Sequence, residues 1–241
     1  MSATAKSRAP VSNLAPRSMS KQVALGVVAG PMFVAAFTAI GAARSGYDWR
    51  RHAVSSLACA RQGWWQRANF ILTGMLWCAA ARGLGQAPRR VVGPPIVPAL
   101  VAAAGVGLVG SGLFVTDPVA GFPPPSAPAG EPGDDVAPAS PAQTWEGHLH
   151  NLSAIPIFAG IPVAGLAAAV AAVRARDYRW ACYSASSSLA MVGSFVLFGA
   201  AFGGKPNLAR NGGIFQRLCI AAGAGWVTAL SCRTLRAFGQ R

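Results

Sequence analysis

Residues 96–116 read IVPALVAAAGVGLVGSGLFVT and contain no charged side chain. About 20 helical residues, each rising about 1.5 Å, cross the roughly 30 Å hydrocarbon core of a bilayer. Lipid offers no hydrogen-bond partners to a backbone, so a segment inside it must satisfy its own amides by forming a helix. The run therefore predicts a transmembrane α-helix.

Five further apolar runs lie along the chain, each bounded by charge, glycine or proline. They cover residues 22–43, 68–84, 149–173, 181–202 and 214–235. Together with 96–116 they predict an all-α fold, a polytopic membrane bundle of six transmembrane helices. Glycines at four-residue spacing, Gly26 with Gly30 and Gly199 with Gly203, predict that helix backbones approach closely there.

The composition agrees with a membrane protein and narrows the functional classes. Hydrophobic residues make up 53% of the chain and charged residues 12%, against about a quarter in a typical soluble domain. A net charge of +14 would favour nucleic acid as the partner of a soluble protein, but here the basic residues lie in short loops between spans, where topology explains them. We therefore expect membrane lipid as a partner, and no nucleic acid.

The distribution of Lys and Arg predicts the orientation. Both tails and the loops after the second and fourth spans carry more basic residues than the remaining loops, and basic loops stay cytoplasmic. We expect a disordered cytoplasmic tail over 1–21, a six-span membrane domain over 22–235 and a second cytoplasmic tail over 236–241. The loop at 117–145, rich in proline and acid, is predicted to be extracytoplasmic. The predicted location is the cell membrane, crossed several times.

Side chains with catalytic or binding capability gather on the predicted outer side, so a site there would open outward. They are Arg50, Arg51 and His52 in the first loop, Asp117 at the end of the third span, Glu146, His148 and His150 before the fourth, and Arg217 about one turn into the sixth.

Four strings of residues next to the spans resemble a known family. They are YDWRRHAVSSLACARQGWWQRANF, GLFVTDP, GHLHNLSA and GIFQR, in this order. The pattern is similar to that of an uncharacterised bacterial integral-membrane family, domain of unknown function 998 (DUF998). The resemblance implies a six-span bundle without an established activity. Carried over residue by residue, it points to His52, Ser55 or Ser56, Asp117, His150 and Arg217.

The physical chemistry of these residues leaves several roles open. An unpaired guanidinium inside a membrane costs several kcal/mol, so Arg217 is predicted to pair with Asp117 or Glu146, either as a link between helices or as part of a catalytic centre. His52, His148, His150 and Asp117 are adequate zinc ligands, or the histidines form hydrogen bonds at the interface. Ser55 or Ser56 could act as a nucleophile with a histidine base, although no nucleophile-elbow glycines flank them.

Two functions follow from different classes. The protein either binds a lipid or isoprenoid phosphate headgroup through Arg217, Arg50 and Arg51, or is a membrane-embedded hydrolase that uses Asp117, His150, His52 and Ser56 on a lipid substrate. The sequence does not decide between binding and catalysis, and it identifies no cofactor.

Overall fold

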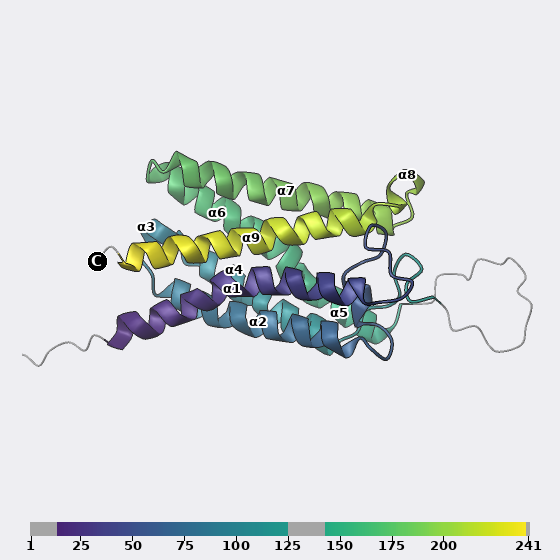
Figure 1. The fold of residues 1–241 in the computed structure, drawn as a ribbon. Coiled ribbons are helices and arrows are strands. Elements are labelled where there is room, and N and C mark those ends of the chain that lie inside the picture. Colours follow the sequence, from purple (N-terminus) through teal and green to yellow (C-terminus); the bar gives the residue numbers. More distant parts are fainter. Residues whose placement is uncertain (1–13, 125–142, 240–241) are drawn as a thin grey trace, which may run out of the picture.

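The structure, a computed structural model, describes residues 14–124 and 143–239. The described chain is helical apart from its loops and one isolated β-bridge between Val119 and Phe122, which confirms the all-α prediction. Its helices (Figure 1) are α1 (Leu14–Ala42), η1 (Ser55–Ala58), α2 (Trp64–Gly85), α3 (Arg89–Val92), α4 (Ile96–Leu113), α5 (Trp145–Ile155), η2 (Pro156–Gly160), α6 (Ile161–Arg174), α7 (Tyr178–Phe202), α8 (Pro206–Ala209) and α9 (Gly212–Gly239).

Five helical segments of the described chain are long and apolar enough to cross a membrane, and the chain is a multi-pass membrane protein. They are Arg17–Ala42 in α1, α4, the continuous rod Trp145–Arg174, α7 and α9. The helix α2 has 22 residues and is therefore long enough, but Gln66, Arg67, Asn69 and Arg82 make it less apolar than the others. Whether α2 is also a span, the second of the six predicted, depends on its place in the bundle.

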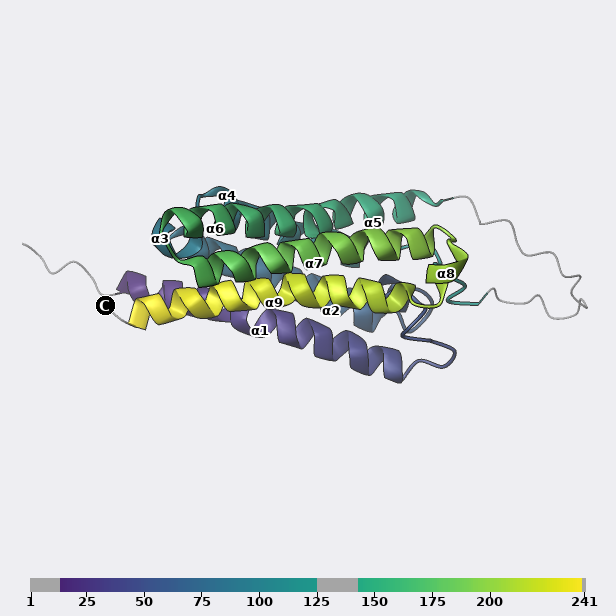
Figure 2. The same cartoon turned by 90° about the horizontal axis from the view of Figure 1, so that it is seen from above.

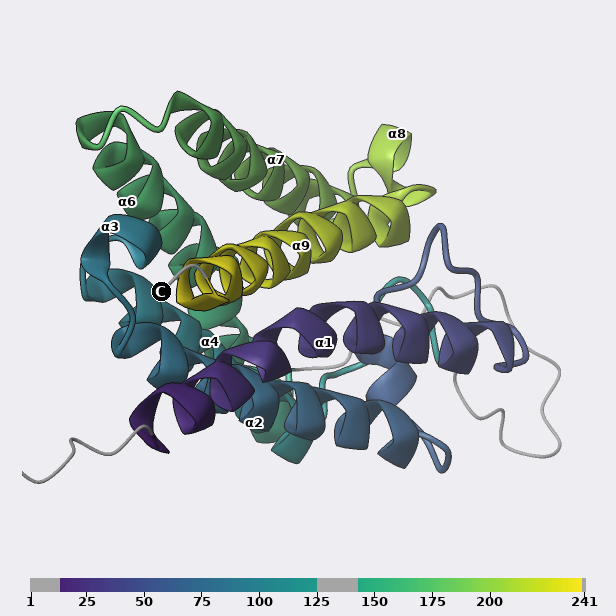
Figure 3. The same ribbon diagram turned by 60° about the vertical axis from the view of Figure 1, so that its left-hand side comes forward.

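The long helices form a closed ring, in which each packs against two neighbours. Around the ring the order is α1, α2, α4, the rod of α5, η2 and α6, then α7 and α9, and α9 packs against α1 again. Figure 3 shows α9 between α7 and α1. The ring encloses a core that includes Trp77, Trp226 and Ile161.

Small residues set how closely neighbouring helices approach. A Cβ added to Gly30 of α1 would lie 2.9 Å from the Ala224 carbonyl oxygen of α9, and one added to Gly26 would collide with Ser231. The prediction for the Gly26 and Gly30 pair is therefore confirmed. The prediction for Gly199 and Gly203 is wrong, because a Cβ added to Gly199 would meet no described atom of another helix within 4 Å and one added to Gly203 would meet only its own helix.

The rod that runs from α5 to α6 contains a π-helical turn at Pro156–Gly160. Pro156 has no backbone N–H, so it cannot continue the regular hydrogen-bond ladder, and the extra residue of a π-turn absorbs the mismatch. Pro162 follows within the first turn of α6. This turn separates α5, which packs on α4, from α6, which packs on α7.

Both described ends of the chain lie at one end of the bundle, which we call the terminal end (Figures 1 and 2). The connections 43–63, 114–124 and 203–211 lie at the opposite end, which we call the loop end. The helix α1 begins at Leu14 and so includes part of the segment predicted as the tail 1–21. Residues 1–13, 125–142 and 240–241, where the rest of the predicted tails and most of the predicted outer loop fall, lie outside the described residues.

Candidate functional site

A cavity of about 520 Å³ lies inside the ring, in the half of the bundle nearer the loop end. Its walls come from α1, α2, α4, α5, η2, α7 and α9. Ligand sites of small molecules are typically about 300–1,000 Å³, mostly apolar, with a few placed polar groups. Most of this lining is apolar and rich in rings, among them Phe33, Phe70, Trp77, Phe158, Phe195 and Phe198.

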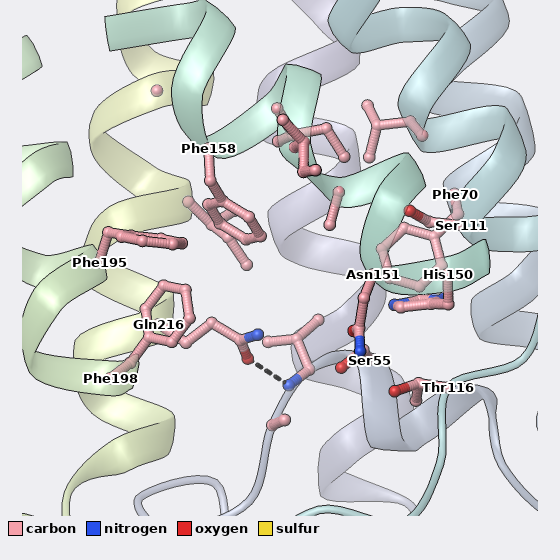
Figure 4. A pocket seen from close by; sticks show the side chains of 18 of the residues that line it. Ser55, Phe70, Ser111, Thr116, His150, Asn151, Phe158, Phe195, Phe198 and Gln216 are labelled. Atoms are coloured by element: carbon pink, nitrogen blue, oxygen red, sulfur yellow. Dashed lines mark hydrogen bonds between the residues drawn. The ribbon is translucent and has the colours of Figure 1, made fainter. Parts of the chain in front are cut away.

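The polar side chains of the cavity gather on the side of the loop end (Figure 4). Gln216 of α9 accepts a hydrogen bond from the Val54 N–H through Oε1, at 2.7 Å. Its amide nitrogen is turned toward Asn151 across the cavity in Figure 4. The polar residues of the lining are Ser55, Ser111, Thr116, His150, Asn151 and Gln216.

His150 of α5 is buried and fixed in orientation. Its Nδ1 lies 3.0 Å from the Phe114 carbonyl oxygen, which can only accept a hydrogen bond, so Nδ1 carries the proton. In the neutral ring Nε2 then remains as an acceptor. The edge of the ring contacts Phe70, with 6.2 Å between ring centroids. One face of the cavity thus offers an imidazole whose tautomer is set by the end of α4.

Two residues of the cavity lining, Ser111 and Trp77, carry a buried polar atom without a hydrogen-bond partner in the described structure, the Ser111 Oγ and the Trp77 Nε1. Their residues are only 2% and 3% exposed. A buried polar group without a partner costs about 1–3 kcal/mol. Both groups can donate a hydrogen bond, and both belong to residues of the cavity wall.

The cavity opens sideways, between α5 and α7. Asn151 and Ile155 on α5, and Phe195 and Gly199 on α7, line the cavity and are also exposed on the outside of the bundle. Phe158 of η2 closes the gap further toward the terminal end, because its ring contacts those of Phe195 and Phe198 at 5.6 and 5.2 Å. These exposed residues belong to two of the helical segments that are long and apolar enough to cross a membrane.

Arg217 pairs with no carboxylate of the described residues, and the prediction that it pairs with Asp117 or Glu146 is wrong. Its Nη1 donates to the carbonyl oxygens of Trp49 (2.7 Å), Gly213 (3.0 Å) and His52 (3.3 Å). Its Nη2 donates to the Tyr47 hydroxyl at 2.6 Å. Fixed carbonyl dipoles satisfy the guanidinium donors as a carboxylate would.

Arg217 therefore joins the first loop to the start of α9. The guanidinium also lies over the rings of Phe37 and Tyr47, at 5.7 and 5.6 Å from their centroids. Burial raises the pKa of Tyr47, and Arg217 partly opposes this rise. We call Arg217, Tyr47 and the 49–52 backbone the loop clamp.

Asp117 fixes the start of α5. Its Oδ1 accepts a hydrogen bond from the Thr144 hydroxyl at 2.7 Å, and its Oδ2 accepts one from the Thr144 N–H at 3.2 Å. Thr144 in turn caps the helix, since its Oγ1 accepts from the Gly147 N–H at 3.0 Å. The structure thus places Asp117 beside the cavity, next to the lining residue Thr116, in a helix-capping network.

His52 belongs to the loop clamp. Its Nδ1 accepts a hydrogen bond from the Asp48 N–H at 2.9 Å, and its ring stacks on Phe122 at 5.2 Å between centroids. Burial, followed by the charge of Arg51, lowers the pKa of His52. The structure does not unite His52 and His150 in a metal site, because the described residues contain no group of three or more His, Cys, Asp or Glu that could hold an ion.

The remaining predicted site residues lie in different surroundings. Ser55 lines the cavity, whereas Ser56 is fully buried beside it and its hydroxyl has no partner in the described structure. Arg50 and Arg51 are exposed at the loop end, and Arg50 lies over the Trp49 ring. His148 is exposed too. Of the predicted residues, His150 and Ser55 thus reach the cavity.

The polar residues that sequence reasoning missed are Ser111, Asn151 and Gln216. Asn151 directly follows His150 in GHLHNLSA, and Gln216 directly precedes Arg217 in GIFQR. The available signal was that each of these uncharged polar side chains is the direct neighbour of a predicted site residue at the start of a span. Ser111 had no such signal, since it lies within a run of small residues.

Comparison with known proteins gives one match. Residues 27–233 match the profile of the family described as "Protein of unknown function (DUF998)". No curated protein and no solved structure matches the chain.

Proposed function

From the premise that the chain belongs to the DUF998 family, whose function is unknown, we propose that it is a multi-pass protein of the cell membrane that binds a lipid-like amphiphile inside its helix bundle. The observation that carries the proposal is the cavity of about 520 Å³, apolar over most of its wall and open between α5 and α7. A molecule dissolved in the bilayer reaches such an opening without passing through water.

The proposed topology has six spans, with α2 as the second of them. Support comes from the ring, where α2 lies lengthwise between α1 and α4, and from the two described chain ends, which share one end of the bundle. Because both described ends of the chain lie at the same end of the bundle, the number of spans must be even. The five most apolar segments therefore require α2 as a sixth span. We propose that this terminal end is cytoplasmic, because the loops and helix ends there carry more Lys and Arg.

Cysteine labelling tests this topology. After removal of the native cysteines, S45C at the loop end and Q86C at the terminal end introduce single exposed thiols. An impermeant reagent on intact cells is expected to label S45C and not Q86C. The opposite pattern would reverse the proposed orientation.

The lining favours an uncharged polar head. Neither Lys nor Arg lines the cavity in the described structure, and its polar groups are hydroxyls, amides and one imidazole. A phosphate buried there would lack a counter-charge, which is costly in a low dielectric. We therefore propose a long-chain alcohol or acylglycerol as the ligand, with its oxygens toward Ser111, His150 and Gln216. A phosphate headgroup would instead meet Arg50 and Arg51 outside the cavity.

Hydrolysis is the weaker alternative. Ser55 and His150 both line the cavity, but among the described residues no hydrogen bond joins a serine to His52 or His150. A serine nucleophile requires such a base within about 3 Å. Asp117, which would orient the base, already binds Thr144.

The unpartnered hydroxyls provide the sharpest test of binding. S111A removes a donor that lines the cavity, whereas S56A removes a buried, equally unpartnered hydroxyl outside it. Radiolabelled dioleoylglycerol in detergent micelles is expected to bind S111A about fivefold more weakly, which is the loss of one hydrogen bond of about 1 kcal/mol. Binding to S56A should equal wild type. Equal binding to all three proteins would count against the proposed pose, and no binding to any of them against the proposed function.

A further inference from the structure

A second hollow, separate from the cavity, lies at the terminal end. It has a volume of about 1040 Å³ and lies between the region of α3, the start of α7 and the end of α9. Its charged lining consists of Arg90, Arg233, Arg236 and Asp177. We call it the basic groove.

One arginine and the carboxylate of the basic groove neutralise each other. The Arg233 Nη1 lies 2.8 Å from the Asp177 Oδ2, and the Arg233 Nε donates to the Val91 carbonyl oxygen at 3.1 Å. The Trp180 N–H hydrogen bond and then Arg233 hold the pKa of Asp177 below its ordinary value. Asp177 therefore stays ionised, and its charge is directed at Arg233.

The other two arginines have no such partner. Arg90 of α3 and Arg236 of α9 are exposed, and neither forms a hydrogen bond or ion pair with the described residues. Three arginines against one carboxylate leave the basic groove with two excess positive charges. Two guanidinium groups that face one hollow form a site for an anion, and phosphate oxygens match the guanidinium fork.

The remaining wall of the basic groove is aromatic and apolar. Trp180 and Tyr183 lie along α7 with 5.5 Å between ring centroids, and Arg233 lies 5.2 Å over the Trp180 ring. Ala229 and Cys232 form the facing side on α9. From the arginines this wall extends along two spans toward the middle of the membrane. Tryptophan and tyrosine with nearby arginine are typical of headgroup depth.

We propose that the basic groove binds an anionic phospholipid, with the phosphate between Arg90 and Arg236 and an acyl chain along Tyr183, Ala229 and Cys232. A free phosphate would use only the arginines, whereas a lipid also uses the apolar wall. The groove lies at the opposite end of the bundle from the polar side of the cavity, so this site is independent of the proposed amphiphile.

The test measures lipid retention by the full-length protein in dodecylmaltoside micelles, using native mass spectrometry and a titration of dioleoylphosphatidylglycerol. R90Q/R236Q removes both unpaired charges. The matched control is R17Q/R82Q, which removes two exposed charges at the same end of the bundle but outside the groove. Each basic residue near an anionic lipid contributes about fivefold in affinity, so R90Q/R236Q is expected to bind about 25-fold more weakly. R17Q/R82Q should resemble wild type.

Two further arms identify the ligand. Dioleoylphosphatidylcholine should bind more weakly than dioleoylphosphatidylglycerol, because Arg90 and Arg236 repel its positively charged choline group. Inorganic phosphate should not compete at concentrations equal to the lipid. Unchanged affinity in R90Q/R236Q, or an equal loss in R17Q/R82Q, would overturn the proposal of a site. Competition by phosphate at equal concentration would overturn its assignment to a lipid.

Discussion

Replacing Arg217 with glutamine should destabilise the protein strongly, although Arg217 pairs with no carboxylate in the part of the chain that the structure describes. Arg217 donates to four acceptors, and two of them keep a donor in R217Q. The His52 carbonyl still accepts from the Tyr47 hydroxyl at 3.3 Å. The Gly213 carbonyl lies in the first turn of α9 and is part of that helix's own hydrogen-bond ladder. The unreplaced losses are the two shortest bonds, to the Trp49 carbonyl at 2.7 Å and to the Tyr47 hydroxyl at 2.6 Å. Hydrogen bonds from charged donors contribute about 1.5–3 kcal/mol each, so the loss of two is expected to cost R217Q about 3–6 kcal/mol.

A double-mutant cycle identifies the partner. The unfolding free energy is measured by titrating sodium dodecyl sulfate into mixed micelles and following tryptophan fluorescence. Y47F and R217Q share a hydrogen bond, so the double mutant should be more stable than the sum of the two losses predicts, by about 1–2 kcal/mol. D117N and R217Q share none, so their losses should add within about 0.5 kcal/mol.

The opposite result would refute this interpretation of the loop clamp. If D117N couples to R217Q and Y47F does not, the guanidinium pairs with the carboxylate in the membrane, and the first loop is not held as described. A loss below about 0.5 kcal/mol in R217Q would mean that water replaces the clamp at no cost.

The remaining predictions concern pH and packing. The pKa of His52 is lowered in the folded state, so the folded ring stays neutral at a pH where the ring of the unfolded chain, with a pKa of 6.5, takes up a proton. The free energy of unfolding should therefore be highest above pH 6.5 and decrease as the pH falls below that value. Unfolding curves of H52N should lose this acid dependence and those of H148N should keep it, and an unchanged dependence in H52N would assign the effect elsewhere. In α2, a Cβ on Gly74 would collide with the Gly105 carbonyl oxygen of α4 and lie 2.9 Å from the Val109 nitrogen. G74A should therefore lower the melting temperature by several degrees. G225A should not lower it, because a Cβ on Gly225 would lie in open space. Equal melting temperatures for the two variants would show that α2 and α4 separate at little cost.

The sequence predicted most of the fold because transmembrane helices are encoded by composition. The apolar run 96–116 required a helix in any arrangement, and the structure has one over Ile96–Leu113. Four other runs required a helix for the same reason. The α2 helix was harder to identify, since Gln66 and Asn69 face the bundle interior, where Asn69 donates to the Phe33 carbonyl oxygen. A helix with a polar buried face has less apolar sequence, although it lies in the same ring.

The arginines of the loop end show which contacts charge alone does not reveal. The predicted first outer loop carries five arginines, Arg44, Arg50, Arg51, Arg61 and Arg67, on the side where the positive-inside rule expects few. In the structure Arg67 donates to the Gly112 and Leu113 carbonyl oxygens at the end of α4, and Arg44 donates to the Cys59 carbonyl oxygen. These guanidinium groups thus donate to main-chain oxygens of a loop and of a helix end. A sequence does not reveal such contacts, because the acceptors are main-chain atoms far away along the chain.

The cavity could not be predicted because its existence depends on an absence of packing. Gly199 has the four-residue spacing of a helix contact, yet α5 and the π-turn leave it without a neighbour, and it lines the opening instead. His150, which the sequence predicted as a site residue, is buried and lines the cavity. Its neighbours in the cavity are uncharged residues from four different helices, which no local motif connects.

Photolabelling with a diazirine analogue of dioleoylglycerol, in membranes that contain the protein, tests most directly whether the cavity holds an amphiphile. We expect adducts on the cavity faces of α5, η2 and α7, near Ile155, Phe158 and Phe195, and competition by unlabelled dioleoylglycerol. G199F, which fills the opening, should lose these adducts, while G193F, a matched change at an open, exposed glycine of α7 outside the cavity, should keep them. Adducts spread over the lipid-facing surface, at Val106 and Leu189 as much as at Phe158, and unaffected by G199F, would contradict binding inside the bundle.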